Sequence, residues 1–84
     1  MTLTPLQSNI IQTANNTTFD VLVEKLKIDI SVYQSSKNDL NKFNMMLTSA
    51  IMNANLSIAN IGLEATKSKI AVMTGALNQF KHLN

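Results

Sequence analysis

FNMMLTSAIMNANLSIANIGL, residues 43–63, is a run of 21 residues with no charged side chain between Lys42 and Glu64. As an α-helix, which rises about 1.5 Å per residue, it would be roughly 30 Å long. Its apolar residues, continued by Ala65 just beyond Glu64, recur in steps of three and four and would form one face: Phe43, Leu47, Ala50, Ala54, Ile58, Ile61 and Ala65. The remaining surface mixes amides and hydroxyls with methionine, isoleucine and leucine, so it is neither a charged solvated face nor a lipid-facing one. The stretch therefore predicts a helix that packs against protein on several sides.

The length and composition favour self-association. With 84 residues, the chain is one domain, residues 1–84, and a domain this short buries a small fraction of its surface. It has no cysteine for disulfides, and only 5% of its residues are aromatic although 45% are apolar. Small domains without disulfides or metals commonly need oligomerisation, because ordering each residue costs about 1.5 kcal/mol. We therefore expect a single all-helical, self-assembling domain.

The first residues predict a short helix. Thr4 suits an N-cap and Pro5 suits the first helical position, while Leu6 and Ile10 share one face. The polar run 15–18 then favours a turn or a cap, because asparagine and threonine side chains hydrogen-bond to the nearby backbone.

Residues 19–33 carry two competing patterns. Apolar residues at 4-3-4-3 spacing form a heptad seam: Phe19, Val23, Leu26, Ile30 and Tyr33. Between residues 25 and 33, however, apolar residues alternate with polar ones, as in a strand. The seam is longer, and a single strand would have no partner in the chain, so we expect a helix. An edge strand that pairs between subunits is the alternative.

A turn is expected at residues 34–36, where Ser36 and Asp39 have the spacing of a capping box. A long helix then covers at least residues 37–61. Gly62 either caps this helix or lies inside a longer one. The prediction is an all-α fold in which a short N-terminal helix and a long helical hairpin pack into a helical self-assembly.

We expect the contacts between copies to come from the apolar stripe of the long helix and from a second stripe beyond Gly62. Small residues at four-residue spacing, such as Ala50 and Ala54, would allow neighbouring backbones to approach closely. The predicted self-assembly interface is Phe43, Leu47, Ala50, Ala54, Ile58, Ile61, Ile70, Met73, Leu77 and Phe80.

The side chains that carry chemistry are few and scattered. His82, the only histidine, lies near the C-terminus, where a general base would not be held in place. Asp20 and Glu24 share a helical face, but two carboxylates beside Lys27 are more typical of a solvated surface than of a metal site. No P-loop, zinc-protease or dinucleotide-binding motif occurs. We therefore expect no enzyme activity, no metal and no cofactor.

Charge and hydropathy limit the kinds of partner and the location that we expect. The net charge of +2 comes from dispersed lysines without arginine, which argues against nucleic-acid binding. The first residues lack the pattern of a cleaved signal peptide, so we expect a cytoplasmic protein, or alternatively one exported without such cleavage. The 21 uncharged residues are long enough to span a bilayer, but four asparagines would then need partners within the hydrocarbon. A small, holin-like pore former is kept as an alternative.

Several residues resemble the small proteins that build bacterial refractile bodies, or R-bodies. The matching residues lie between about Gln7 and Val72, and are Tyr33, Gln34, Ser35, Phe43, Ala50, Ala65 and Thr66. The resemblance implies a cytoplasmic subunit that polymerises, with copies of itself and with paralogous subunits, into a coiled ribbon. In that family the ribbon can unroll, in some members on acidification, and rupture a membrane, which is then contacted only as a target. Asp20 and Glu24 would be a pH-responsive pair, because protonation removes the repulsion between them, and the pH of extension should depend on both.

Two other classes share these features. Type III secretion needle or inner-rod subunits are also small, helical and free of cysteine, and needle subunits carry Tyr-Gln-Ser near a helical turn. In those proteins the tripeptide lies much nearer the C-terminus, whereas 49 residues follow Ser35 here. A dimeric helical adaptor or chaperone is the third class.

Overall fold

A computed structural model describes residues 2–83, and these residues form helices and no strands. The predicted all-α class is therefore confirmed. The elements are α1 (Pro5–Asn16), α2 (Phe19–Ser35), α3 (Asp39–Ile61), α4 (Leu63–Thr74) and a 3₁₀ segment, η1 (Gly75–Leu83).

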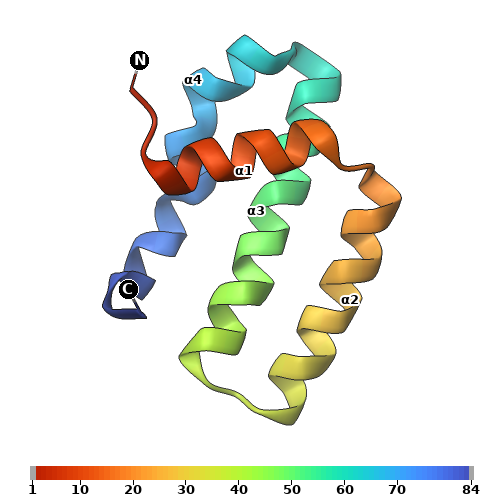
Figure 1. The fold of residues 1–84 in the computed structure, drawn as a ribbon, viewed down its shortest axis with the longest axis vertical. Helices are drawn as coiled ribbons and strands as arrows, with labels where there is room; N and C mark the ends of the chain where they lie inside the picture. The colour runs from red at the N-terminus through yellow and green to blue at the C-terminus, as the bar shows by residue number, and fades with distance from the viewer. Residues whose placement is uncertain (1, 84) are drawn as a thin grey trace.

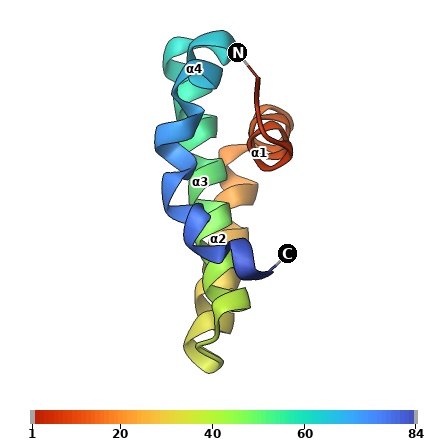
Figure 2. The same cartoon turned by 90° about the vertical axis from the view of Figure 1, so that its left-hand side faces the viewer.

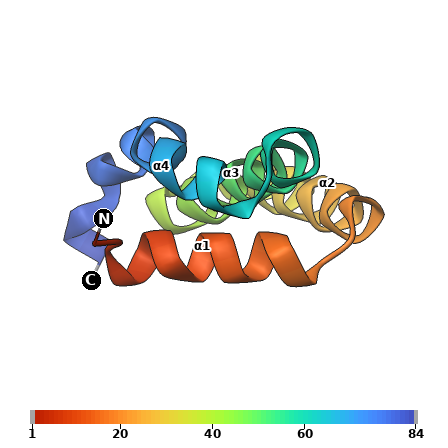
Figure 3. The same ribbon diagram turned by 90° about the horizontal axis from the view of Figure 1, so that it is seen from above.

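The helices are arranged around α3. Helices α2, α3 and α4 run alternately down, up and down in one layer, and η1 continues the direction of α4 (Figure 1). Helix α1 crosses this layer on one side only, as the side and top views show (Figures 2 and 3). The molecule is accordingly flat, with dimensions of 37 × 29 × 16 Å. Helix α3 contacts α1, α2, α4 and η1, so the chain itself covers several sides of the uncharged stretch.

Helix α1 begins as the sequence predicted. Thr4 Oγ1 accepts a hydrogen bond from the backbone N–H of Gln7 (3.1 Å), and the Gln7 side chain accepts one from the N–H of Thr4 (3.0 Å). This capping box satisfies two N–H groups that a helix start otherwise leaves without partners. The helix then buries Ile10, Ile11 and Ala14 against the layer.

The link between α1 and α2 lies in the predicted polar run. Thr18 is the N-cap of α2 and accepts a hydrogen bond from the N–H of Val21. A side chain of α3 also holds this link, because Asn55 Nδ2 donates to the carbonyl oxygens of Ala14 (3.1 Å) and Thr17 (2.9 Å). The last turn of α1 is thereby fixed to the middle of the molecule.

Residues 25–33 are helical, so the alternative of an edge strand is wrong. The buried side of α2 also differs from the predicted seam. Leu22 and Asp29 are buried, whereas Phe19 and Ile30 are exposed. The reason is chemical: the Asp29 carboxylate has hydrogen-bond partners inside the protein, so a charged residue occupies a position that hydropathy alone would place outside.

The predicted capping box at Ser36 and Asp39 is wrong. Ser36 instead ends α2, with its N–H donating to the carbonyl oxygen of Val32 (3.0 Å). Asn38 caps α3 by accepting from the N–H of Asn41 (2.8 Å), so α3 begins at residue 39 rather than 37. Asparagine is as good an N-cap as serine. The spacing of Ser36 and Asp39 favoured a capping box two residues too early, so the sequence did not identify Asn38 as the cap.

Gly62 separates α3 from α4. Its backbone has φ 91° and ψ 166°, a region essentially restricted to glycine, and its N–H donates to the carbonyl oxygen of Ile58. The chain reverses at this one residue. On either side of Gly62, Ser57 Oγ of α3 and Thr66 Oγ1 of α4 lie 2.7 Å apart and join the two helices.

The two glycines should respond oppositely to alanine. Gly62→Ala should lower the free energy of unfolding by about 1–3 kcal/mol, because alanine is strained at this φ and ψ. Gly75→Ala should raise it by about 0.4–1 kcal/mol, since Gly75 is already right-handed helical and an added Cβ meets nothing within 4 Å. Urea denaturation of both variants measures the difference. Equal effects of the two substitutions would contradict this account.

Candidate functional site

The side of α3 that faces away from α1 is the candidate site. Asn55 points toward α1, since it donates to α1 carbonyl groups. Asn53 lies two residues earlier, about 200° around the helix, and so points the opposite way. Four residues recur on this side of α3 at spacings of four, three and four: Ser49, Asn53, Leu56 and Asn60. We call these four residues, together with the adjoining side of α2, the outer face.

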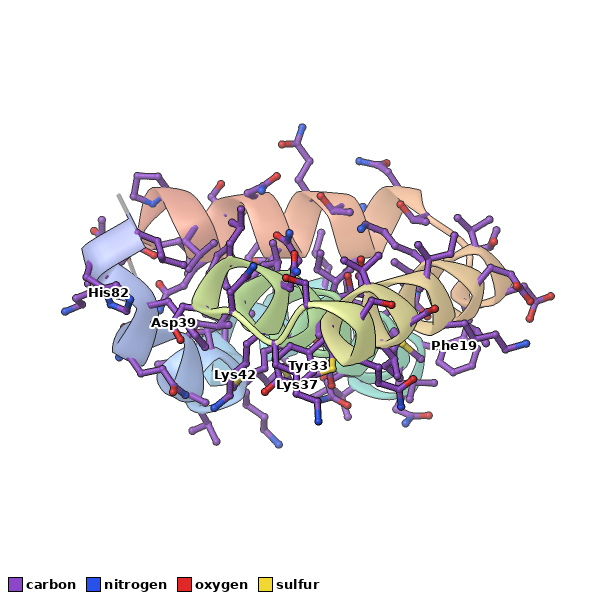
Figure 4. All side chains as sticks on the ribbon, turned by 90° about the horizontal axis from the view of Figure 1, so that it is seen from below. Phe19, Tyr33, Lys37, Asp39, Lys42 and His82 are labelled. Carbon is purple, nitrogen blue, oxygen red and sulfur yellow. The ribbon has the colours of Figure 1, made fainter. Side chains whose placement is uncertain are left out.

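Helix α2 adds apolar side chains to the outer face. Figure 4 shows Phe19 on the side of α2 away from α1. Val23 and Ile30 lie four and eleven residues further on and share that side. Phe19 and Ile30 are 37% and 38% exposed, and Leu56 on α3 is 46% exposed. The outer face is therefore an apolar strip beside a strip of amides and hydroxyls.

A shallow hollow marks the other border of the outer face. It has a volume of about 140 Å³ between α3 and the junction of α4 with η1. Met46, Ser49 and Asn53 line it from α3, and Met73 and Ala76 line it from the opposite wall. Methionine adapts to irregular gaps, which suits such a border to contact with another protein.

Two lysines, Lys37 and Lys42, lie near the start of α3, at one end of the outer face. Lys42 lies seven residues before Ser49, on the same side of α3, and Figure 4 shows Lys37 and Lys42 at this end of the layer. The nearest carboxylates of α2 are exposed, and Glu24 pairs with Lys27 at 3.3 Å, as expected for a solvated pair. Within residues 2–83, Asp20 and Glu24 have no third metal-ligating side chain beside them.

The predicted self-assembly residues lie mostly inside the chain. Ala50, Ala54, Ile70, Leu77 and Phe80 are buried by the chain's own helices. The other residues of the predicted interface, Ile61 excepted, are partly buried and pack against this core: Phe43, Leu47, Ile58 and Met73. Their periodicity correctly predicted a mostly buried set of side chains. The surface that covers the five buried residues is the same molecule, so these five are not free to contact another copy.

The sequence predicted that Ser49, Asn53 and Asn60 lie on a helix surface that is neither charged nor lipid-facing, but it assigned the contacts between copies to the apolar stripe instead. The signal was available, since amides and hydroxyls recurring in steps of three and four without a charge are unusual on an exposed helix side.

His82 contacts a carboxylate of α3. Its Nε2 lies 2.9 Å from Oδ2 of Asp39, which joins η1 to the first turn of α3. Figure 4 shows the two side chains at the same end of the molecule. Both are more than half exposed, so the contact is a surface one and adds little stability.

The described residues contain no group of three side chains suited to holding a metal ion. None of the helices within residues 2–83 has both the length and the hydropathy that a membrane span requires. No protein-family model, curated protein or solved structure matches this chain significantly.

Proposed function

We propose that this chain is a non-enzymatic structural subunit that polymerises through packing of its outer face against other copies. One observation supports the proposal above the others. The chain covers three sides of α3 with α1, α2 and α4, and leaves the fourth side exposed and, from Ser49 to Asn60, uncharged. A helix side that remains in water normally carries charged residues.

The composition of the outer face suits contact between identical molecules. Asn53, Asn60 and Ser49 can each donate and accept hydrogen bonds, so the same residues can satisfy one another across a symmetric contact. Leu56 and Phe19 supply apolar area beside them. The net charge of +2 is small, so repulsion between copies is weak.

A polymer needs a second contact surface, and α2 provides one. Val21, Ile28 and Val32 recur at spacings of seven and four on the α2 side opposite Ile30, and are 57%, 63% and 45% exposed. One self-complementary surface closes a dimer, whereas two different surfaces can extend an open chain. The outer face and this α2 stripe together favour a ribbon or filament of the R-body type.

Three glutamate variants test the proposal. Leu56→Glu places a charge in the outer face, Ile28→Glu places one in the α2 stripe, and Ser31→Glu places one at an exposed position of α2 outside both surfaces. Sedimentation and negative-stain microscopy should show ribbons or filaments of the unaltered chain. The first two variants should each raise the concentration needed for polymers by at least about tenfold, since burying an unpaired charge is costly.

The variants also distinguish the two surfaces. Ile28→Glu should leave small closed oligomers held by the outer face, whereas Ser31→Glu should behave as the unaltered chain. A monodisperse monomer at high concentration of the unaltered chain would refute the proposal. Hollow needles instead of ribbons would move it to the secretion-needle class.

A further inference from the structure

A second hollow lies on the other side of the layer, away from the outer face. It is formed where the start of α1, the start of α3 and η1 meet, at the end of the molecule that holds the C-terminal segment (Figure 1). Its volume of about 580 Å³ is within the range of about 300–1,000 Å³ typical of small-molecule sites. The hollow is open to solvent at one side.

Its wall is mostly apolar. Phe43 and Phe80 form an edge-to-face pair with ring centroids 5.5 Å apart, and Phe80 and Leu77 are buried. Leu40 and Leu83 also line the hollow but are substantially exposed, Leu40 by 57%. An apolar wall with exposed leucines leaves hydrocarbon area in water, and an apolar ligand would remove it.

One charge accompanies this wall. Among residues 2–83, Lys81 is the only charged residue that lines the hollow, and no side-chain carboxylate of these residues lines it. Lys81 forms no salt bridge within residues 2–83, while Asp39, which precedes Leu40, is held by His82. Asn78 adds an amide to the same wall. Within the part of the chain that the structure describes, the hollow thus combines a hydrocarbon surface with one cation outside any salt bridge and a neutral hydrogen-bonding group.

We propose that this hollow binds an unbranched fatty acid, with the hydrocarbon chain against Leu6, Leu40 and Phe80 and the carboxylate at Lys81. Charge complementarity favours an anionic head group over a neutral or cationic one. An apolar wall with a single lysine among its described lining residues favours one hydrocarbon chain with one charged end. This binding is independent of the outer face, because the two surfaces lie on opposite sides of α3.

Titration of the full chain with dodecanoate, below its micelle concentration, tests the proposal. Calorimetry should show saturable binding of one dodecanoate per chain. Affinity should rise by about three- to fourfold for each methylene from octanoate to dodecanoate, because each buried methylene contributes about 0.8 kcal/mol. Dodecanol and dodecyltrimethylammonium, with equal chains, test the contribution of the charge.

Substitutions of exposed residues locate the site without disturbing the core. Lys81→Gln should weaken dodecanoate binding by about tenfold and leave dodecanol binding unchanged, whereas Lys81→Arg should retain it. Leu40→Asn should weaken both ligands. The matched controls are Lys69→Gln and Val72→Asn, which change an exposed lysine and an exposed apolar residue outside the hollow and should have no effect.

Several results would overturn the assignment. They are the absence of saturable binding, equal affinity for dodecanoate and dodecyltrimethylammonium, or dodecanoate binding that Leu40→Asn leaves unchanged. Loss of self-association in Leu40→Asn, with no dodecanoate binding by the unaltered chain, would show instead that a second copy fills the hollow.

Discussion

Replacing Ile10 with alanine should lower the free energy of unfolding by about 2–5 kcal/mol, the largest effect expected of a single substitution in this protein. Ile10 is fully buried in the part of α1 that crosses the layer. The substitution removes apolar carbons and leaves a cavity that rigid neighbouring helices fill only in part. A domain of this size has a stability of roughly 5–15 kcal/mol, so the loss is a large fraction of the total.

Ile28→Ala is the matched control. It deletes the same atoms at a position that is 63% exposed, so it should change stability by no more than about 0.5 kcal/mol. Urea denaturation should be followed at two protein concentrations, since self-association adds a concentration-dependent term to apparent stability. Equal destabilisation by the two substitutions would mean that α1 does not dock as described.

Local chemistry made part of this fold predictable. Thr4 and Pro5 predicted the first turn of α1, because this turn forms among residues close in sequence; Gln7, which completes the capping box, was not part of the prediction. Residues 25–33 needed a choice between two periods, and the longer one was right because it extended over the whole of α2. Gly62 was recognised as a place where the chain could turn, although its φ decides the matter only in the structure.

The partners of each face could not be predicted in the same way. Periodicity shows that the side of α3 with Ala50 and Ala54 is buried, but a second molecule and the chain's own α1 or α4 would leave the same pattern. Whether a turn brings an element back onto α3 depends on caps such as Asn38 and on the angle at Gly62. These features fix the tertiary arrangement, but the sequence gives only a weak signal for them.

The hollow near Lys81 could not be predicted from the sequence for a related reason. Leu6, Leu40 and Phe80 belong to three elements that are far apart in the chain. Their juxtaposition depends on the crossing of α1 over the layer, which no local pattern encodes. The α3 part of the outer face was easier to predict from the sequence, because its residues all belong to one helix.

The second large effect is expected at the buried polar contact between α2 and α3. Thr48 Oγ1 donates to Oδ2 of Asp29 at 2.5 Å, and Lys25 Nζ lies 3.3 Å from both carboxylate oxygens. Thr48 is fully buried and Asp29 nearly so, whereas the Lys25 side chain is mostly exposed. Among the described residues, the threonine is therefore the only interior donor to a carboxylate that has little access to water.

Thr48→Val should lower the free energy of unfolding by about 1–3 kcal/mol. Valine has nearly the shape of threonine, so the substitution removes the donor with little change in packing and leaves a charged acceptor buried without it. Asp29→Leu in the same chain should recover much of this loss, since leucine resembles aspartate in shape and two apolar groups then meet across the interface.

The cycle of single and double substitutions separates this hydrogen bond from simple packing. If the contact acts as a pair, the double variant should be more stable than the sum of the two single losses predicts, by at least about 0.5 kcal/mol. Denaturant unfolding of the four chains, with equal slopes, measures this difference. Additive losses would mean that Asp29 and Thr48 act independently, and that α2 is held against α3 by Leu22 and its apolar neighbours alone.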